Sequence, residues 1–172
     1  KDMHFVDASG ISLESKGEES GEKIIYAGFD DNDKLVGYAI EASGIGFADI
    51  IRILYGYDPH KQEVIGFYVL ESKETPGLGD KIEKDDVFLA NFKDLDVSLK
   101  SDLSGPNNKV VTVKSGAKKN KWELDGITGA TISSRAIGDI IGTSTEMWLP
   151  VIYPNYQNIK GSKTETNKED NE

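Results

Sequence analysis

The sequence contains no cysteine and no long apolar run. Without a thiolate, the chain cannot use a cysteine nucleophile, hold an iron–sulfur cluster through cysteine or attach a cofactor through sulfur. The absence of cysteine also removes any disulfide signal for a cellular compartment. No apolar stretch approaches the roughly 18 residues that a membrane-spanning helix needs.

Positive charge is scarce as well. The 172 residues carry a formal net charge of −10, and arginine occurs only at positions 52 and 135. Such a surface repels phosphate backbones, so nucleic acid is excluded as a partner. One cluster of lysines within 114–121 is the exception, and it is either a solvated loop or a docking site for a partner.

The length fits one domain, with no internal repeat. We expect residues 1–21 to form a polar connecting arm and residues 22–156 to form the folded domain. Residues 157–172 consist mostly of Lys, Glu, Asn, Thr and Ser, a composition typical of a disordered tail.

Short β-branched and aromatic segments separated by turn residues dominate the first half of the chain. They predict strands over 24–29, 35–42, 47–56 and 63–70, with a glycine-rich link at 43–46. Short turns between them indicate antiparallel pairing. The fold-class prediction is therefore α+β: a single domain with a mostly antiparallel twisted sheet and packed helices.

The second half is more mixed. The pattern predicts a short helix over 84–92, edge strands at 95–99 and 109–113, and a helix beginning near Thr131. An apolar face on that helix would contain Ile132 and Trp148, and Pro150 and Pro154 would end it.

No metal site is predicted. The acidic turn 30–33 lacks the spacing and the terminal glutamate of an EF-hand. His60 lies in a turn without a second histidine or any cysteine beside it.

The stretch 125–134, DGITGATISS, combines small residues with hydroxyl residues directly before the long helix. Backbone N–H groups and the positive end of a helix dipole at such a junction favour an anion such as phosphate. An ordinary helix capped by Ser or Thr after a glycine turn explains the same pattern.

A second turn-rich stretch is 74–82, ETPGLGDKI, where Pro76, Gly77 and Gly79 permit tight turning. A rigid connection explains the proline and glycines but not Leu78, an apolar side chain expected at a loop tip. Glu74 either acts at a ligand or braces the loop.

These two stretches, in this order, resemble the two signature segments of the FMN-binding domain family found in RnfG and NqrC. The resemblance implies that FMN is the cofactor and that Thr131 carries it through a phosphoester bond. It implies further cofactor contacts from both segments: Thr128, Gly129, Ala130, Ile132, Ser133, Glu74, Thr75 and Leu78. Asp125 belongs to the part of the motif that the flavin transferase ApbE recognises.

The resemblance also implies a redox subunit, not a stand-alone enzyme, that works with other subunits of a membrane ion-translocating complex. The Rnf G subunit is favoured over NqrC because 74–82 continues as Gly-Asp-Lys-Ile and the domain is compact. The family implies the outer side of the cytoplasmic membrane and an N-terminal anchor. We expect this chain to be the soluble portion without that anchor.

Two other functional classes compete with this interpretation. The same fold can act as a ligand-binding or partner-binding module that is never flavinylated. A hydrolase using Ser133 or Thr131 is disfavoured because His4 and His60 are poorly placed as bases and no Gly-x-Ser-x-Gly elbow is present. No catalytic residue is assigned.

Overall fold

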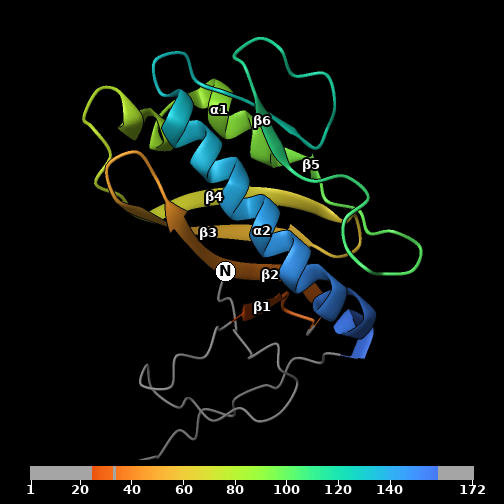
Figure 1. Cartoon of the computed structure of the whole chain (residues 1–172). Coiled ribbons are helices and arrows are strands. Elements are labelled where there is room, and N and C mark those ends of the chain that lie inside the picture. The colour runs from red at the N-terminus through yellow and green to blue at the C-terminus, as the bar shows by residue number, and fades with distance from the viewer. Residues whose placement is uncertain (1–24, 33, 159–172) are drawn as a thin grey trace, which may run out of the picture.

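One long helix crosses one face of an antiparallel sheet (Figure 1). The structure, a computed structural model, describes residues 25–32 and 34–158. The sheet has the order β1-β2-β3-β4-β5. Its strands are β1 (Ile25–Phe29), β2 (Leu35–Ile45), β3 (Ile50–Asp58), β4 (Glu63–Glu71) and β5 (Leu95–Asp96). The predicted α+β class is confirmed.

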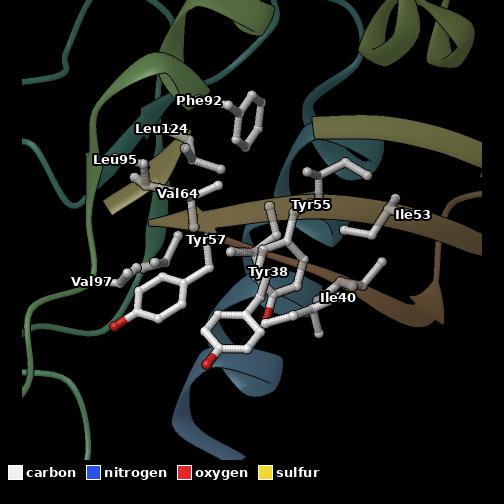
Figure 2. Packing of buried hydrophobic residues seen from close by; sticks show 14 of the residues in the cluster. Tyr38, Ile40, Ile53, Tyr55, Tyr57, Val64, Phe92, Leu95, Val97 and Leu124 are labelled. Atoms are coloured by element: carbon white, nitrogen blue, oxygen red, sulfur yellow. The ribbon is translucent and has the colours of Figure 1, made fainter. Parts of the chain in front are cut away.

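Alternation of side chains places the core on one face of the sheet. In β3, Ile51, Ile53, Tyr55 and Tyr57 are buried while Arg52 between them is exposed. Figure 2 shows this buried layer continuing into Tyr38 and Ile40 of β2 and into Val64 of β4. Successive side chains of a strand point to opposite faces of the sheet, which is why only one face of β3 meets the core.

Aspartate side chains close two of the hairpin turns. The Asp30 carboxyl accepts from the backbone N–H groups of Asn32 and Lys34, both at 2.9 Å, and these bonds hold the pKa of Asp30 below its usual range. Asp58 accepts from the N–H of His60 at 2.9 Å in the same way. Turns of this kind follow from local Asp chemistry, which explains why the sequence indicates them.

The predicted link at 43–46 is wrong in part. Strand β2 continues to Ile45, and β3 begins only at Ile50, so the hairpin tip lies at 46–49. The tip is closed by a hydrogen bond of 2.8 Å from the Gly46 N–H to the Asp49 carbonyl. Phe47, predicted inside a central strand, is instead 63% exposed at this tip.

The predicted helix over 84–92 is split. A 3-10 helix, η1 (Gly79–Glu83), precedes α1 (Asp86–Ala90), and η2 (Asn91–Lys93) follows it. The Asp85 carboxyl caps α1 by accepting from the Phe88 N–H at 2.9 Å. Phe88 and Phe92 then pack against Phe67 of the sheet, with the Phe67 and Phe92 rings stacked at 4.5 Å.

A small two-stranded sheet lies outside the main one. It pairs β6 (Val111–Val113) with β7 (Glu123–Asp125) in parallel. β7 was not predicted, because three residues are too few to show a period. The edge strand expected at 95–99 is β5 alone, two residues long.

Helix α2 (Thr131–Asn155) runs through both prolines, so the predicted stop at Pro150 is wrong. A 3-10 turn, η3 (Tyr156–Asn158), follows. Leu149 and Ile152 are buried in the core on either side of Pro150. We attribute the continued helix to this burial, which offsets the hydrogen bonds that the prolines remove.

The expected arm at 1–21 and all but residues 157–158 of the expected tail lie outside the described residues. Within the described ranges, none of the helices combines the length and the apolar character needed to cross a bilayer.

Candidate functional site

The first segment of the site is a tight turn at Thr75–Leu78. The Leu78 N–H donates to the Thr75 carbonyl at 3.1 Å, and Gly77 in the third position has φ +76°. Proline in the second position and a residue with positive φ in the third are the signature of a type II turn. The turn leaves the Leu78 side chain 51% exposed, as the sequence predicted for a loop tip.

The second segment is a turn that leads into α2. The Ala130 N–H donates to the Ile127 carbonyl at 3.1 Å, and Gly129 in the third position has φ +85°. Ile127 and Ala130 are buried and anchor the turn, so Thr128 and Gly129 are left on the surface. Thr131 follows as the first residue of the helix, with its side chain exposed.

The start of α2 has no side-chain cap. Ala130 occupies the N-cap position and makes no capping bond, and the first turn contains no acidic residue. The first helical hydrogen bond is donated by the Ser134 N–H to the Ala130 carbonyl at 2.9 Å. The N–H groups of residues 131–133 therefore have no carbonyl of the helix to bind, and with the helix dipole they favour an anion. The alternative of a Ser- or Thr-capped helix is wrong.

Glu74 brings the two segments together. Its Oε2 atom accepts a hydrogen bond from the Ser133 hydroxyl of α2. Its Oε1 atom accepts from the N–H groups of Phe47 at 2.8 Å and Ala48 at 3.0 Å, both in the β2–β3 hairpin tip. Three parts of the chain that are distant in sequence thus meet at one side chain, which is 6% exposed.

Two polar groups close to Thr131 form hydrogen bonds within the protein. The Ser133 hydroxyl is bound to Glu74, and the Ser134 N–H is bound within the helix. The prediction that Ile132 lies on the apolar face of α2 is wrong, because this residue is 54% exposed. Arg135, one turn into the helix, is also exposed.

The hairpin tip is the part of the site that the sequence did not reveal. Phe47 presents its ring to solvent while its N–H is held by Glu74. An ion pair of 2.6 Å between Lys73 and Asp49 is a second tie between the tip and the segment before Thr75, and it holds the pKa of Asp49 below its usual range. The paired glycines 44 and 46 were the available signal, since they favour a tip over a continuous strand.

Asp125 has a structural role in this arrangement. Its Oδ1 atom accepts from the N–H groups of Gly116 at 2.7 Å and Ala117 at 3.2 Å. The Asn91 side chain binds both the N–H and the carbonyl of Asp125. Asp125 therefore fixes the lysine-containing loop beside the start of the motif.

The basic cluster at 114–121 is partly committed within the fold. Lys118 donates to Asn91 at 3.1 Å. Lys121 pairs with Asp94 at 3.2 Å and Glu63 at 3.5 Å, and these carboxylates raise the pKa of Lys121. Only Lys114 and Lys119 of the four remain as exposed charges without an ion pair among the described residues.

His60 lies far along the chain from the hydroxyl residues at the start of α2. His60 packs edge-on against Tyr156, beyond the last residue of α2, whereas Ser133 and Thr131 lie at the first turn of that helix. Within residues 25–32 and 34–158, no cluster of three His, Cys, Asp or Glu side chains is arranged to hold a metal ion.

Residues 46–146 match the FMN-binding domain family. The chain is 31% identical over 134 residues to the G subunit of the ion-translocating oxidoreductase complex of Methanosarcina acetivorans, covering 77% of this chain and 63% of that protein. It is 36% identical over 120 residues to the protein of the same name from Haemophilus influenzae, covering 67% and 51%.

A third relative is the G subunit of the Na(+)-translocating ferredoxin:NAD(+) oxidoreductase complex of Acetobacterium woodii. It is 31% identical over 149 residues, which cover 86% of this chain and 64% of the relative. The chain thus spans between 51% and 64% of the length of these relatives.

Two solved structures share the fold. NqrC of Shewanella oneidensis superposes with a TM-score of 0.63 at 18% identity, covering 90% of this chain and 72% of that one. The C subunit of the Na(+)-translocating NADH-quinone reductase of Parabacteroides distasonis gives 0.66 at 23% identity, covering 88% and 77%.

Proposed function

Because the chain belongs to the FMN-binding domain family, for which FMN is the cofactor, we propose that it is an electron-transfer subunit of a membrane ion-translocating oxidoreductase. We further propose that Thr131 carries the FMN through a phosphoester bond. The observation that carries this second proposal is the exposed Thr131 hydroxyl at the uncapped start of α2.

The residues around Thr131 fit a phosphate group. The backbone N–H groups of residues 131–133 would bind its oxygens, and the dipole of a 25-residue helix favours its charge. Gly129 and Ala130 keep bulk away from the hydroxyl, and the exposed Thr128 adds a second hydroxyl in the preceding turn.

The flavin ring requires an apolar surface and a few polar partners at its edge. Leu78, Ile132 and Phe47 are all more than half exposed, and they come from the three segments that Glu74 joins. We propose that these side chains form the apolar surface and that the exposed Thr75 lies at the edge of the ring. Bound FMN would supply the electron transfer, while the protein fixes its orientation and surroundings.

Attachment is a group transfer from FAD. The Thr131 oxygen attacks the phosphorus of the FMN half, the hydroxyl proton is lost, the pyrophosphate bond breaks and AMP leaves. We propose that ApbE, with a divalent metal, catalyses this step and recognises the motif that begins at Asp125. Since Asp125 holds the loop at 116–117, we propose that it contributes to recognition by fixing that loop in place for ApbE.

The membership that we propose is the Rnf-type complex, in which this chain would relay electrons in a ferredoxin:NAD oxidoreductase. The support for this membership is that the three relatives described above are G subunits, together with the Gly-Asp-Lys-Ile continuation of the first segment. Other subunits of the complex would be its partners. The location would be the outer side of the cytoplasmic membrane, through an N-terminal helix. The alternative is an NqrC-type protein, whose fold it shares.

Coexpression with ApbE tests the proposal. We expect a yellow protein whose intact mass exceeds that of the polypeptide by one FMN less one water, and whose fluorescence survives denaturation. A colourless protein of unmodified mass after coexpression would support a non-redox binding module instead.

Leu78→Ala is expected to loosen the flavin ring without weakening the fold. The side chain is half exposed, so its loss should change the free energy of unfolding by about 0.5 kcal/mol or less. Thermal melts of the apo protein and fluorescence anisotropy of the attached flavin would measure the two effects. A loss of roughly 2–5 kcal/mol would instead identify Leu78 as a core residue.

A further inference from the structure

We infer that Glu74 is a positioning residue that fixes the β2–β3 hairpin tip against the first turn of α2, and that it does not contact the flavin. The inference rests on the proposed function for its relation to FMN, but the contacts themselves are independent of it. Each carboxyl oxygen serves a different element: Oε1 binds the hairpin and Oε2 binds the helix.

Both oxygens of the carboxyl group are bound within the protein. It accepts three hydrogen bonds from groups that lie 26, 27 and 59 residues away in sequence. The residue is 6% exposed, so little of it remains to meet a ligand. These contacts favour bracing over direct action on the ring, the two roles that the sequence left open for Glu74.

Two glycines make room for this carboxyl group. A Cβ atom added at Gly79 would lie 2.5 Å from Glu74 Oε2 and 2.9 Å from the Ser133 oxygen. A Cβ atom added at Gly46 would collide with Glu74 Oε1 and with Ile51. Glycine at positions 46 and 79 is therefore explained by the space that the buried Glu74 side chain occupies.

The groups that Glu74 holds are adjacent to the groups proposed to hold FMN. It binds the N–H of Phe47 itself, and it binds Ser133, two residues after Thr131. The position of the apolar hairpin tip relative to the attachment hydroxyl is thus set by one carboxyl group. The Lys73–Asp49 pair is a weaker tie, because both side chains are largely exposed.

Hydrogen exchange of the apo protein tests the positioning role directly. In Glu74→Ala, exchange at the Phe47 and Ala48 amides should accelerate by roughly ten-fold or more, because both lose their acceptor. Glu74→Gln keeps an oxygen for these amides and a donor toward Ser133, so it should restore most of the protection. The matched control is Glu71→Ala, which removes an exposed glutamate at the end of β4, shortly before Glu74 in the sequence.

The flavinylated variants provide a second measurement. Glu74→Ala should still carry FMN at Thr131, with a lower fluorescence anisotropy than Glu74→Gln or Glu71→Ala. If the wild-type protein acquires no FMN, the proposed function fails while the exchange experiment still decides the positioning role.

Unchanged exchange at both amides in Glu74→Ala would overturn the inference. If Glu74→Ala unfolds, the same measurements are made on Glu74→Gln and on Ser133→Ala. Ser133→Ala removes only the hydrogen bond between Glu74 and α2. Ser133→Ala should leave the Phe47 amide partly protected and lower the flavin anisotropy. Anisotropy equal to wild type in Ser133→Ala would contradict a role in joining the hairpin to the helix.

Discussion

Thr131→Ala is expected to abolish covalent FMN attachment completely while leaving the fold intact. The substitution removes the only atom that we propose to be esterified, so after coexpression with ApbE the protein should show no fluorescent band on a denaturing gel. Its intact mass should equal that of the polypeptide, and peptide mapping should find the fragment around position 131 unmodified.

The fold should survive because, among the described residues, no hydrogen bond or ion pair involves the Thr131 side chain. Thr131 is the first helical residue and is exposed, and the N-cap position belongs to Ala130. The Ser134 hydroxyl donates to the Thr131 carbonyl, which alanine retains. We therefore expect a change in unfolding free energy within about 0.5 kcal/mol, smaller than the loss of a true cap.

Two neighbouring variants make the result specific. Thr131→Ser keeps a hydroxyl and should be flavinylated at least in part. Thr128→Ala removes the exposed hydroxyl of the preceding turn and should reduce the yield without eliminating the product. Fluorescence that persisted in denatured Thr131→Ala protein would place the attachment elsewhere and disprove the assignment.

The sheet could be predicted because its signals are local. Strands β1 to β4 are rich in β-branched and aromatic residues, and Asp30 and Asp58 close their turns with hydrogen bonds to nearby N–H groups. The exception is the hairpin tip. Phe47 reads as a strand residue by composition, yet its N–H binds Glu74, and no local pattern reveals a contact 27 residues away.

The end of α2 could not be predicted from local signals. Pro150 is a strong local stop signal, but the burial of Leu149 and Ile152 is a tertiary effect that a sequence pattern does not weigh. The parallel pairing of β6 with β7 could not be predicted either. Each strand is only three residues long, too short to give a local signal.

The candidate site also has parts that local signals predict and parts that they do not. The two turn-rich segments and the exposed Leu78 follow from proline and glycine chemistry in the sequence. The contact of Ser133 with Glu74 could not be predicted from the sequence in this way, because it depends on how α2 lies against η1.

Gly138→Ala should destabilise the protein, which is the reverse of the usual effect in a helix. In an exposed helix interior, alanine is more favourable than glycine by about 1 kcal/mol. Gly138, however, lies against β6: an added Cβ would collide with the Thr112 hydroxyl and lie 3.3 Å from the Thr112 nitrogen. That same hydroxyl donates to the Ser134 carbonyl at 3.0 Å, so it cannot move aside without losing this bond.

We expect the overpacking to outweigh the gain in helix propensity, with a net loss of about 1–3 kcal/mol measured by urea unfolding at unchanged m-value. Asp139→Ala, on the exposed side of the same turn, is the matched control and should change stability by about 0.5 kcal/mol or less. Adding Thr112→Ala to Gly138→Ala removes the colliding hydroxyl and should recover part of the loss. If Gly138→Ala alone were as stable as wild type, β6 would be free to move away from α2, and the close packing would not constrain the helix that carries Thr131.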